Sequence, residues 1–343
     1  MKGISRTAAI AAGAALVASL AAVAEDARGL LERMERTLAT RNYQGTFVHE
    51  HDGQTETMQI VHRAENGKFA ERVVSLDGSG REVVQRDGEL RAYFPDQRVV
   101  LVEEGPKGGL LLSGLTGLDS ASAQLYRLSE EAPTRVSGRE ARVISVEPQD
   151  DLRYGYRVWI DEATAMPLKT QSHTVAGKVV EQLIFTDLTM PDHISHWALQ
   201  PASATRQYHL LRHTAATGTA ANQTVLTTWD ASELPPGFRL IGHSTQILGD
   251  GQQSVTHLVF SDGLASVSVF VEPQSPDAAE RGGTAAAPLM SNVGSSTAMS
   301  TEVDGHKVTT IGEVPPNCVR AITGSLHVGF APSTRPMSAA TRR

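Results

Sequence analysis

Four dipeptides divide residues 43–103 into short runs, and they constrain the fold more than any other feature of the chain. They are Asp52-Gly53, Asn66-Gly67, Asp77-Gly78 and Asp87-Gly88. Such pairs suit tight hairpins, because both central residues of the turn need a positive φ angle. The runs between them alternate polar and apolar residues with a period of two. They predict an antiparallel meander with strands at 43–50, 56–63, 68–75, 81–86, 89–94 and 98–103.

The residues before the meander predict one amphipathic helix over 26–40. Leu30, Leu31, Met34 and Leu38 fall on a single face of that helix, and Asp26 can cap its start. Further strands are predicted at 142–147, 154–160, 167–173 and 179–188. About ten strands are too many for one flat sheet. We therefore expect a mainly β (α+β) fold whose residues 25–191 form a large curved antiparallel half-barrel.

A change of composition separates a second unit from the first. Residues 192–222 are rich in Ala, Thr, His and Gln, and we interpret them as a connector with a short helix near 208–213. A small α+β domain is predicted over 223–330, and no periodicity indicates a parallel sheet. Its predicted strands are 238–246, 254–261, 264–271, 301–303 and 307–311, with a loop at 274–296 and a final helix opened by Pro315-Pro316. Residues 331–343 are expected to be disordered.

The first 24 residues predict export. Lys2 and Arg6 give a positive start, an apolar run follows, and Ala22-Val23-Ala24 matches a signal-peptidase site. The run is too short to cross a bilayer. Because no Cys follows the cleavage point, we expect a mature protein without a lipid anchor, soluble in the periplasm or secreted. The formal net charge of −7 gives no electrostatic footprint for nucleic acid.

The sequence lacks the common catalytic motifs. It contains no Gly-x-Ser-x-Gly elbow, no phosphate-binding loop and no Gly-x-Gly-x-x-Gly after a strand. Cys318 is the sole cysteine; a buried inert thiol and a bridge between chains are both open. Metal-like spacings occur in His49-Glu50-His51, His193-x-x-His196 and His209-x-x-x-His213. None is joined by Cys, and surface histidines explain the last two. We expect no catalytic residue, no metal and no cofactor.

Residues 108–118 form an apolar, glycine-rich segment without periodicity. Two interpretations are open. The segment folds back to plug its own barrel, or it forms a lid over an apolar cavity that takes an acyl chain or a hydrophobic segment of a partner. The candidate ligand-binding residues are Leu110, Leu111, Leu112, Leu115, Leu118, Tyr154 and Tyr156.

Several longer motifs resemble one family. They are Leu234-Pro235-Pro236-Gly237-Phe238 after Trp229, the runs 260–272 and 305–316, Tyr43-x-Gly45-Thr46-Phe47, and Trp159-Ile160-Asp161 before Pro167-Leu168. Together they resemble the MucB/RseB family, periplasmic negative regulators of the extracytoplasmic stress sigma factor. The resemblance covers nearly the whole chain after the leader. The motifs of the first unit are also similar to those of periplasmic lipoprotein carriers.

The resemblance implies a regulatory role without catalysis. It implies that the protein binds the periplasmic part of an inner-membrane anti-sigma factor and shields it from the initiating protease. Release would follow the sensing of lipopolysaccharide, another lipid or a mislocalised lipoprotein, and a homo-oligomer is expected. The small domain is implied to contact the partner, and exposed hairpin edges suit strand addition. We expect that contact at Phe260, Asp262, Gly263, Leu264 and Phe270. The alternative is a diffusible carrier of lipid or lipoprotein, which would have no use for the second unit.

Overall fold

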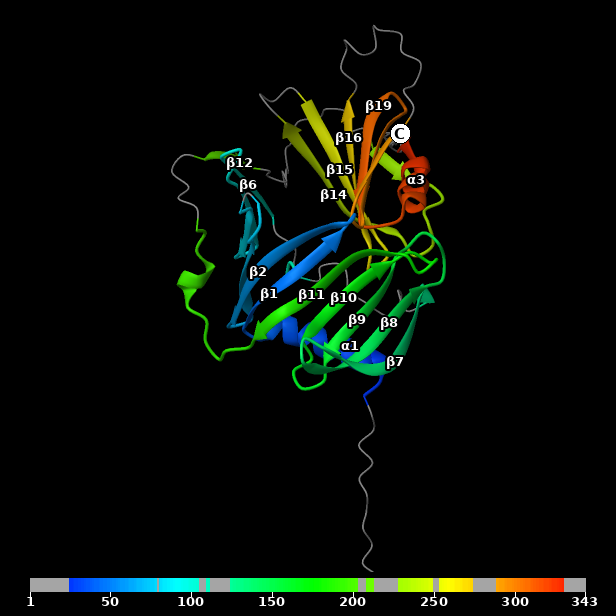
Figure 1. Cartoon of the computed structure of the whole chain (residues 1–343). Coiled ribbons are helices and arrows are strands. Elements are labelled where there is room, and N and C mark those ends of the chain that lie inside the picture. The colour runs from blue at the N-terminus through cyan, green and yellow to red at the C-terminus, as the bar shows by residue number, and fades with distance from the viewer. Residues whose placement is uncertain are drawn as a thin grey trace, which may run out of the picture.

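The computed structural model describes residues 25–78, 80–104, 109–111, 124–202, 208–212, 228–248, 253–273 and 288–329. The predicted leader, the predicted disordered tail, and Leu112, Leu115 and Leu118 lie outside these residues. Two sheets dominate the structure: a large curved sheet from the N-terminal part and a smaller one from the C-terminal part (Figure 1). We call these parts the large and the small domain. No helix among the described residues is long and apolar enough to cross a membrane.

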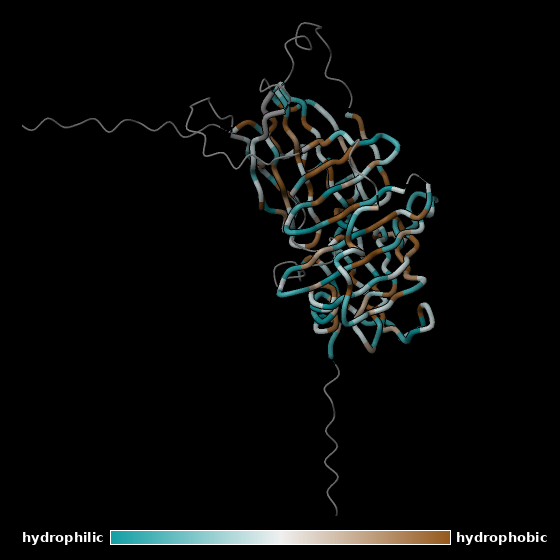
Figure 2. The backbone as a smooth tube through the Cα atoms, turned by 90° about the vertical axis from the view of Figure 1, so that its left-hand side faces the viewer, coloured by the Kyte–Doolittle hydropathy of each residue, from teal (hydrophilic) through white to brown (hydrophobic). Residues whose placement is uncertain are grey.

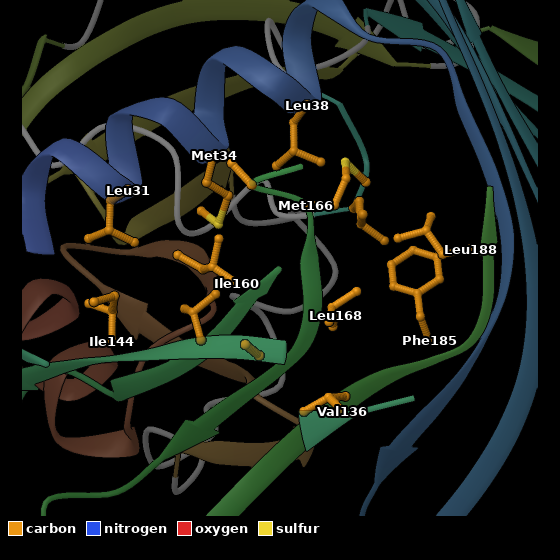
Figure 3. Packing of buried hydrophobic residues seen from close by; sticks show 14 of the residues in the cluster. Leu31, Met34, Leu38, Val136, Ile144, Ile160, Met166, Leu168, Phe185 and Leu188 are labelled. Carbon is orange, nitrogen blue, oxygen red and sulfur yellow. The ribbon is translucent and has the colours of Figure 1, made fainter. Parts of the chain in front are cut away.

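The predicted N-terminal helix is confirmed as α1, Ala27–Thr40. Asp26 caps it by accepting a hydrogen bond from the backbone N–H of Gly29 at 2.8 Å. Its apolar face is buried against the inside of the large sheet, where Leu31, Met34 and Leu38 point toward strand residues such as Ile160 (Figure 3). The helix therefore supplies much of the core that the curved sheet encloses.

Within the part of the chain that the structure describes, the large sheet has twelve strands in the order β12-β6-β5-β4-β3-β2-β1-β11-β10-β9-β8-β7. Their bounds are β1 Tyr43–His51, β2 Gln54–Glu65, β3 Lys68–Ser75, β4 Glu82–Arg86, β5 Glu89–Phe94, β6 Val99–Glu104, β7 Tyr126–Val136, β8 Arg139–Pro148, β9 Gly155–Asp161, β10 Pro167–His173, β11 Val179–Thr189 and β12 His209–Arg212. The predicted meander is confirmed. Both residues of its turns have positive φ at Asp52-Gly53, Asn66-Gly67 and Asp87-Gly88.

Two features of the large sheet differ from the sequence predictions. β7 was not predicted, because residues 129–135 are all exposed and show no apolar alternation. The predicted helix near 208–213 is wrong: residues 209–212 form β12, which pairs in parallel with β6. This parallel pair is a local departure, at one edge, from the antiparallel sheet that the sequence predicts. Leu210 and Leu211 are both exposed on this edge strand, so its sequence carries no period of two.

The connector begins as part of the large domain. Residues His196–Leu199 form a short 3₁₀ helix, η2, capped by Ser195. Ile194 and Leu199 are buried against Val61 of β2. Residues 194–199 are thus packed on the sheet and do not form a free linker.

In its described residues, the small domain combines a six-stranded sheet, a two-stranded sheet and one helix. Its elements are β13 Thr228–Ala231, β14 Arg239–Leu248, β15 Gln253–Ser261, β16 Ser266–Pro273, β17 Leu289–Val293, β18 Ser296–Val303, β19 His306–Gly312, α3 Pro316–Ser325 and β20 Leu326–Gly329. The larger sheet has the order β14-β15-β16-β19-β18-β17, and β13 pairs with β20. Figure 2 shows hydrophobic stretches within the strands of both domains.

Helix α3 covers one face of the six-stranded sheet. Val319 and Ile322 pack with Val267 and Val269 of β16. Cys318 is buried there too, and burial raises the pKa of its thiol to about 12, as expected for an inert cysteine. The predicted loop at 274–296 is wrong for residues 289–293, which form β17. That strand is mostly exposed and again shows no alternation.

Candidate functional site

The two domains meet around one buried arginine. Arg153 lies between β8 and β9, and its side chain is fully buried. Its Nε donates a hydrogen bond to Oδ2 of Asp262, at the turn between β15 and β16, at 2.6 Å. Its two other nitrogens donate to Asp150 and to the backbone carbonyl of Pro236. A single guanidinium thus joins the large domain to two separate loops of the small domain.

Asp262 is fully engaged at this junction. Its Oδ1 accepts from the backbone N–H groups of Leu264 and Ala265 at 2.9 and 2.7 Å. Its Oδ2 also accepts from the hydroxyl of Tyr126 at 3.3 Å. Burial, followed by the negative charge of Asp262, raises the pKa of Tyr126, which keeps that hydroxyl protonated as a donor. A buried ion pair is stable only with such complete hydrogen bonding.

A second polar contact joins the two domains. It connects β11 and the C-terminal end of β1, in the large domain, to the turn between β17 and β18 of the small domain. Glu181 in β11 accepts from Nε2 of His49 through Oε1 and from the hydroxyl of Ser295 through Oε2, the latter at 2.5 Å. Nearby, the backbone N–H of Gly294 donates to Asp52 at 2.5 Å. Burial alone would raise the pKa of Glu181, but the hydrogen bonds from His49 and Ser295 lower it, so the carboxylate is charged.

A buried carboxylate in the large domain, that of Glu71, binds residues 109–111, the described part of the apolar segment, which we call the loop tip. Oε2 of Glu71 accepts from the backbone N–H of Leu110 at 2.7 Å, and Oε1 accepts from the hydroxyl of Tyr43 at 3.4 Å. Burial, followed by the charge of Glu71, raises the pKa of Tyr43. His62 stacks on Tyr43 with ring centroids 4.5 Å apart. A Cβ at Gly109 would lie 2.9 Å from Oε2 of Glu71, so a larger residue at this position would require the Glu71 side chain to shift.

We expect Glu71→Ala to free this loop tip. A hydrogen bond to a charged acceptor contributes about 1.5–3 kcal/mol, so the Leu110 amide should exchange with deuterium about tenfold faster or more. Glu71→Gln keeps a neutral acceptor at the same place and should increase the exchange rate less than Glu71→Ala does. Hydrogen exchange followed by mass spectrometry measures both. Equal exchange in all three proteins would contradict the role given to Glu71.

Comparison with known proteins identifies the family. The MucB/RseB N-terminal domain matches residues 26–203, and the MucB/RseB C-terminal domain matches residues 223–327. The chain belongs to the MucB/RseB family. The family resemblance drawn from the sequence motifs is therefore confirmed, and so is the fold class, a large curved sheet with a small C-terminal α+β domain.

Individual MucB/RseB proteins match along nearly their full length. The sigma factor AlgU regulatory protein MucB of Pseudomonas aeruginosa is 32% identical over 302 residues, covering 88% of this chain and 90% of its own. The sigma-E factor regulatory protein RseB of Escherichia coli K12 is 24% identical, with 93% and 96% covered. The crystal structure of MucB in complex with MucA(peri) is 30% identical, with a TM-score of 0.66 and 89% and 100% covered.

The junction takes up most of the residues that we expected to contact a partner of this MucB/RseB protein. Phe260, Asp262 and Leu264 are all buried, and Leu264 belongs to the hydrophobic core of the large domain. Gly263 occupies the turn with a φ of +103°. Phe260 is buried in the core of the small domain, whereas Asp262 and Leu264 are buried because their turn is inserted against the large domain, so none of these side chains is exposed to a partner in this structure. Phe270 is different: it lies half-buried on the face away from α3 and stacks on His257, with centroids 4.4 Å apart.

Four of the residues expected to bind a ligand are among those that the structure describes, and they lie in the large domain. Leu111 is buried in the core, and Leu110 packs against the same cluster. For residues 109–111, this arrangement agrees with the first of our two interpretations, in which the segment folds back into its own barrel. Tyr154 is buried and Tyr156 packs beside the core. The sequence reasoning missed Arg153, Glu71 and Glu181, because nothing in the chain marks which distant residue pairs with a lone charge.

Proposed function

We propose that this protein binds the periplasmic part of a membrane-spanning anti-sigma factor and protects it from the initiating protease. It thereby keeps the envelope-stress sigma factor inactive until a lipid-type or lipoprotein signal arrives. The observation that carries the proposal is the likeness, over 89% of this chain, to MucB solved in complex with MucA(peri). The role requires no catalysis, and the compartment is the periplasm. The carrier alternative leaves the ordered small domain unexplained.

The outer strand β17 suits an extended segment of the partner. It is the last strand of the six-stranded sheet among those described, and Leu289 and Val293 are 76% and 64% exposed. A peptide can add to such an edge through backbone hydrogen bonds, with side-chain contacts giving specificity. The turn after β17 carries Gly294 and Ser295, which contact the large domain. A peptide bound to this edge would therefore affect the contacts that Gly294 and Ser295 make with the large domain. Phe270 remains a candidate for additional contact.

Ligand sensing is assigned to the loop tip. A lipid-type ligand that enters the core would displace Leu110 and Leu111 and break the hydrogen bond from Leu110 to Glu71. A ligand can shift a domain arrangement only as far as it binds one arrangement more tightly than another. The ligand would therefore have to favour an arrangement in which the partner is released. We also propose that the protein forms a homo-oligomer.

A protease-protection experiment tests the proposal. The purified chain should bind the anti-sigma factor's periplasmic domain and slow its cleavage by the initiating protease. Charged substitutions on the edge, Leu289→Lys with Val293→Lys, should weaken binding by about tenfold or more, equivalent to about 1.4 kcal/mol. Leu240→Lys on the opposite outer strand, β14, is the matched control and should have little effect. An unchanged cleavage rate with the parent protein would refute the function, whereas equal effects of both edges would refute only the assignment to β17.

A further inference from the structure

The register of three neighbouring strands brings four ligand-type side chains together beside the domain junction. His49 of β1 lies opposite Glu56 of β2, and His51 of β1 lies opposite Glu181 of β11. Because side chains alternate between the two faces of a sheet, His49 and His51 share one face, and their directly opposed neighbours share it too. Imidazole and carboxylate groups from separate strands thus converge at one point.

Distances within the cluster are close to those of a metal site. His49, His51 and Glu56 each offer a ligand atom, and these atoms lie within 4.8 Å of one another. The two imidazole centroids are 4.9 Å apart. Zinc bonds of about 2.1 Å place tetrahedral ligands about 3.4 Å apart. All three residues are only partly buried, so side-chain rotation can close the difference without movement of the strands.

Hydrogen bonds from neighbouring residues orient the proposed ligands for metal binding. Nε2 of His49 is hydrogen-bonded to Glu181, so Nδ1 is the ring nitrogen that remains for a metal ion. A carboxylate behind the imidazole is the usual support of a metal-bound histidine. Arg81 donates to Oε1 of Glu56 at 2.6 Å and so orients that carboxylate, while no described residue makes a hydrogen bond to Oε2. Nδ1 of His51 is buried, with no hydrogen-bond partner among the described atoms.

We propose that His49, His51 and Glu56 bind a Zn²⁺ ion. Two imidazoles and one carboxylate suit zinc better than Mg²⁺ or Ca²⁺, which prefer oxygen ligands. A water molecule completes the four ligands. The proposal departs from our expectation of no metal: the spacing of His49 and His51 lacks a third ligand in the sequence, and the sheet register supplies it from Glu56.

The site would couple metal binding to the domain junction. Glu181 supports His49 through one oxygen and accepts from Ser295 of the small domain through the other. A bound ion fixes His49, and His49 fixes the carboxylate that Ser295 contacts. Zinc should therefore stabilise the arrangement of the two domains seen here, because a ligand stabilises the state that binds it.

Calorimetric titration of the untagged mature protein with ZnCl₂ tests the site. We expect one ion per chain, with binding lost in His51→Ala and Glu56→Gln. Glu181→Gln should bind about 10–100-fold more weakly, the usual loss when a supporting carboxylate is removed. The double variant His193→Ala, His196→Ala removes two exposed histidines of metal-like spacing and should bind as the parent does.

Two further measurements keep the test decisive. Thermal unfolding without metal checks that each variant is folded; Glu56→Gln retains an acceptor for Arg81 and should unfold near the parent temperature. Co²⁺ in place of zinc should give the visible absorption of a four-coordinate ion in the parent and not in His51→Ala. The proposal would be overturned if the single variants His51→Ala and Glu56→Gln each bound zinc as the parent does. It would also be overturned if binding were lost only in the double variant of His193 and His196.

Discussion

Replacing Asp262 with Ala should lower the free energy of unfolding by about 3 kcal/mol, near the lower end of the roughly 3–5 kcal/mol typical of a broken buried ion pair, because Asp150 remains as a second carboxylate partner of the buried Arg153. The guanidinium of Arg153 is fully buried and would lose its hydrogen bond to the carboxylate. Leu264, Ala265 and Tyr126 would lose their acceptor as well. Denaturant unfolding followed by circular dichroism measures the change.

The control for this prediction is an ion pair of the same domain that lies in solvent. Lys307 and Glu272 are 3.3 Å apart, with side chains 57% and 36% exposed. Exposed pairs contribute about 0–1 kcal/mol, so Lys307→Ala should have little effect. An apolar pair, Arg153→Met with Asp262→Leu, should recover much of the loss, since neither charge then remains buried. A loss below about 1 kcal/mol in Asp262→Ala would show that water replaces the carboxylate.

Leu264→Ala should destabilise both domains together. The side chain comes from the turn between β15 and β16 of the small domain, yet it is buried in the hydrophobic core of the large domain. Truncation of a buried leucine costs about 2–5 kcal/mol, depending on how far the cavity collapses. Trp159 in β9 and Trp229 in β13 report on the two domains, and their fluorescence transitions in single-tryptophan variants should shift in parallel.

Ile311→Ala provides the comparison, because Ile311 is 40% exposed on β19 and its loss should cost much less. A shift confined to the Trp229 transition after Leu264→Ala would mean that the turn stabilises only its own domain. A parallel shift would establish that the two cores unfold as one unit. In that case the junction is part of the cooperative fold, and partner release must proceed without its full separation.

The meander was predictable because its signals are local. An Asx-Gly pair determines a turn, and the turn determines which strands are neighbours. The same reasoning failed for β7, β12 and β17, whose residues are largely exposed and so carry no alternation. Parallel pairing of β12 with β6 joins segments more than a hundred residues apart, and no turn signal announces it.

The candidate site was less predictable for a related reason. Asp262-Gly263 reads as an ordinary exposed turn, and only the three-dimensional structure shows that Arg153 lies opposite Asp262. The same holds for Glu56 and Glu181 beside the two histidines of β1. Local sequence identifies the residue types that can take part in a site, whereas strand register decides which of them meet.

Strand β1 connects the two ends of the large domain. Tyr43 at its start contacts Glu71 near the loop tip, and His49, about 20 Å farther along at 3.3 Å per residue, contacts Glu181 near the small domain. β1 is hydrogen-bonded to β2 on one side and to β11 on the other. A strand held on both sides cannot slip by one residue without turning every side chain to the opposite face. β1 therefore moves as a rigid element. A displacement at Tyr43 can reach His49 only if the whole sheet tilts or bends, so the stiffness of the sheet would determine how strongly the two ends of β1 are coupled.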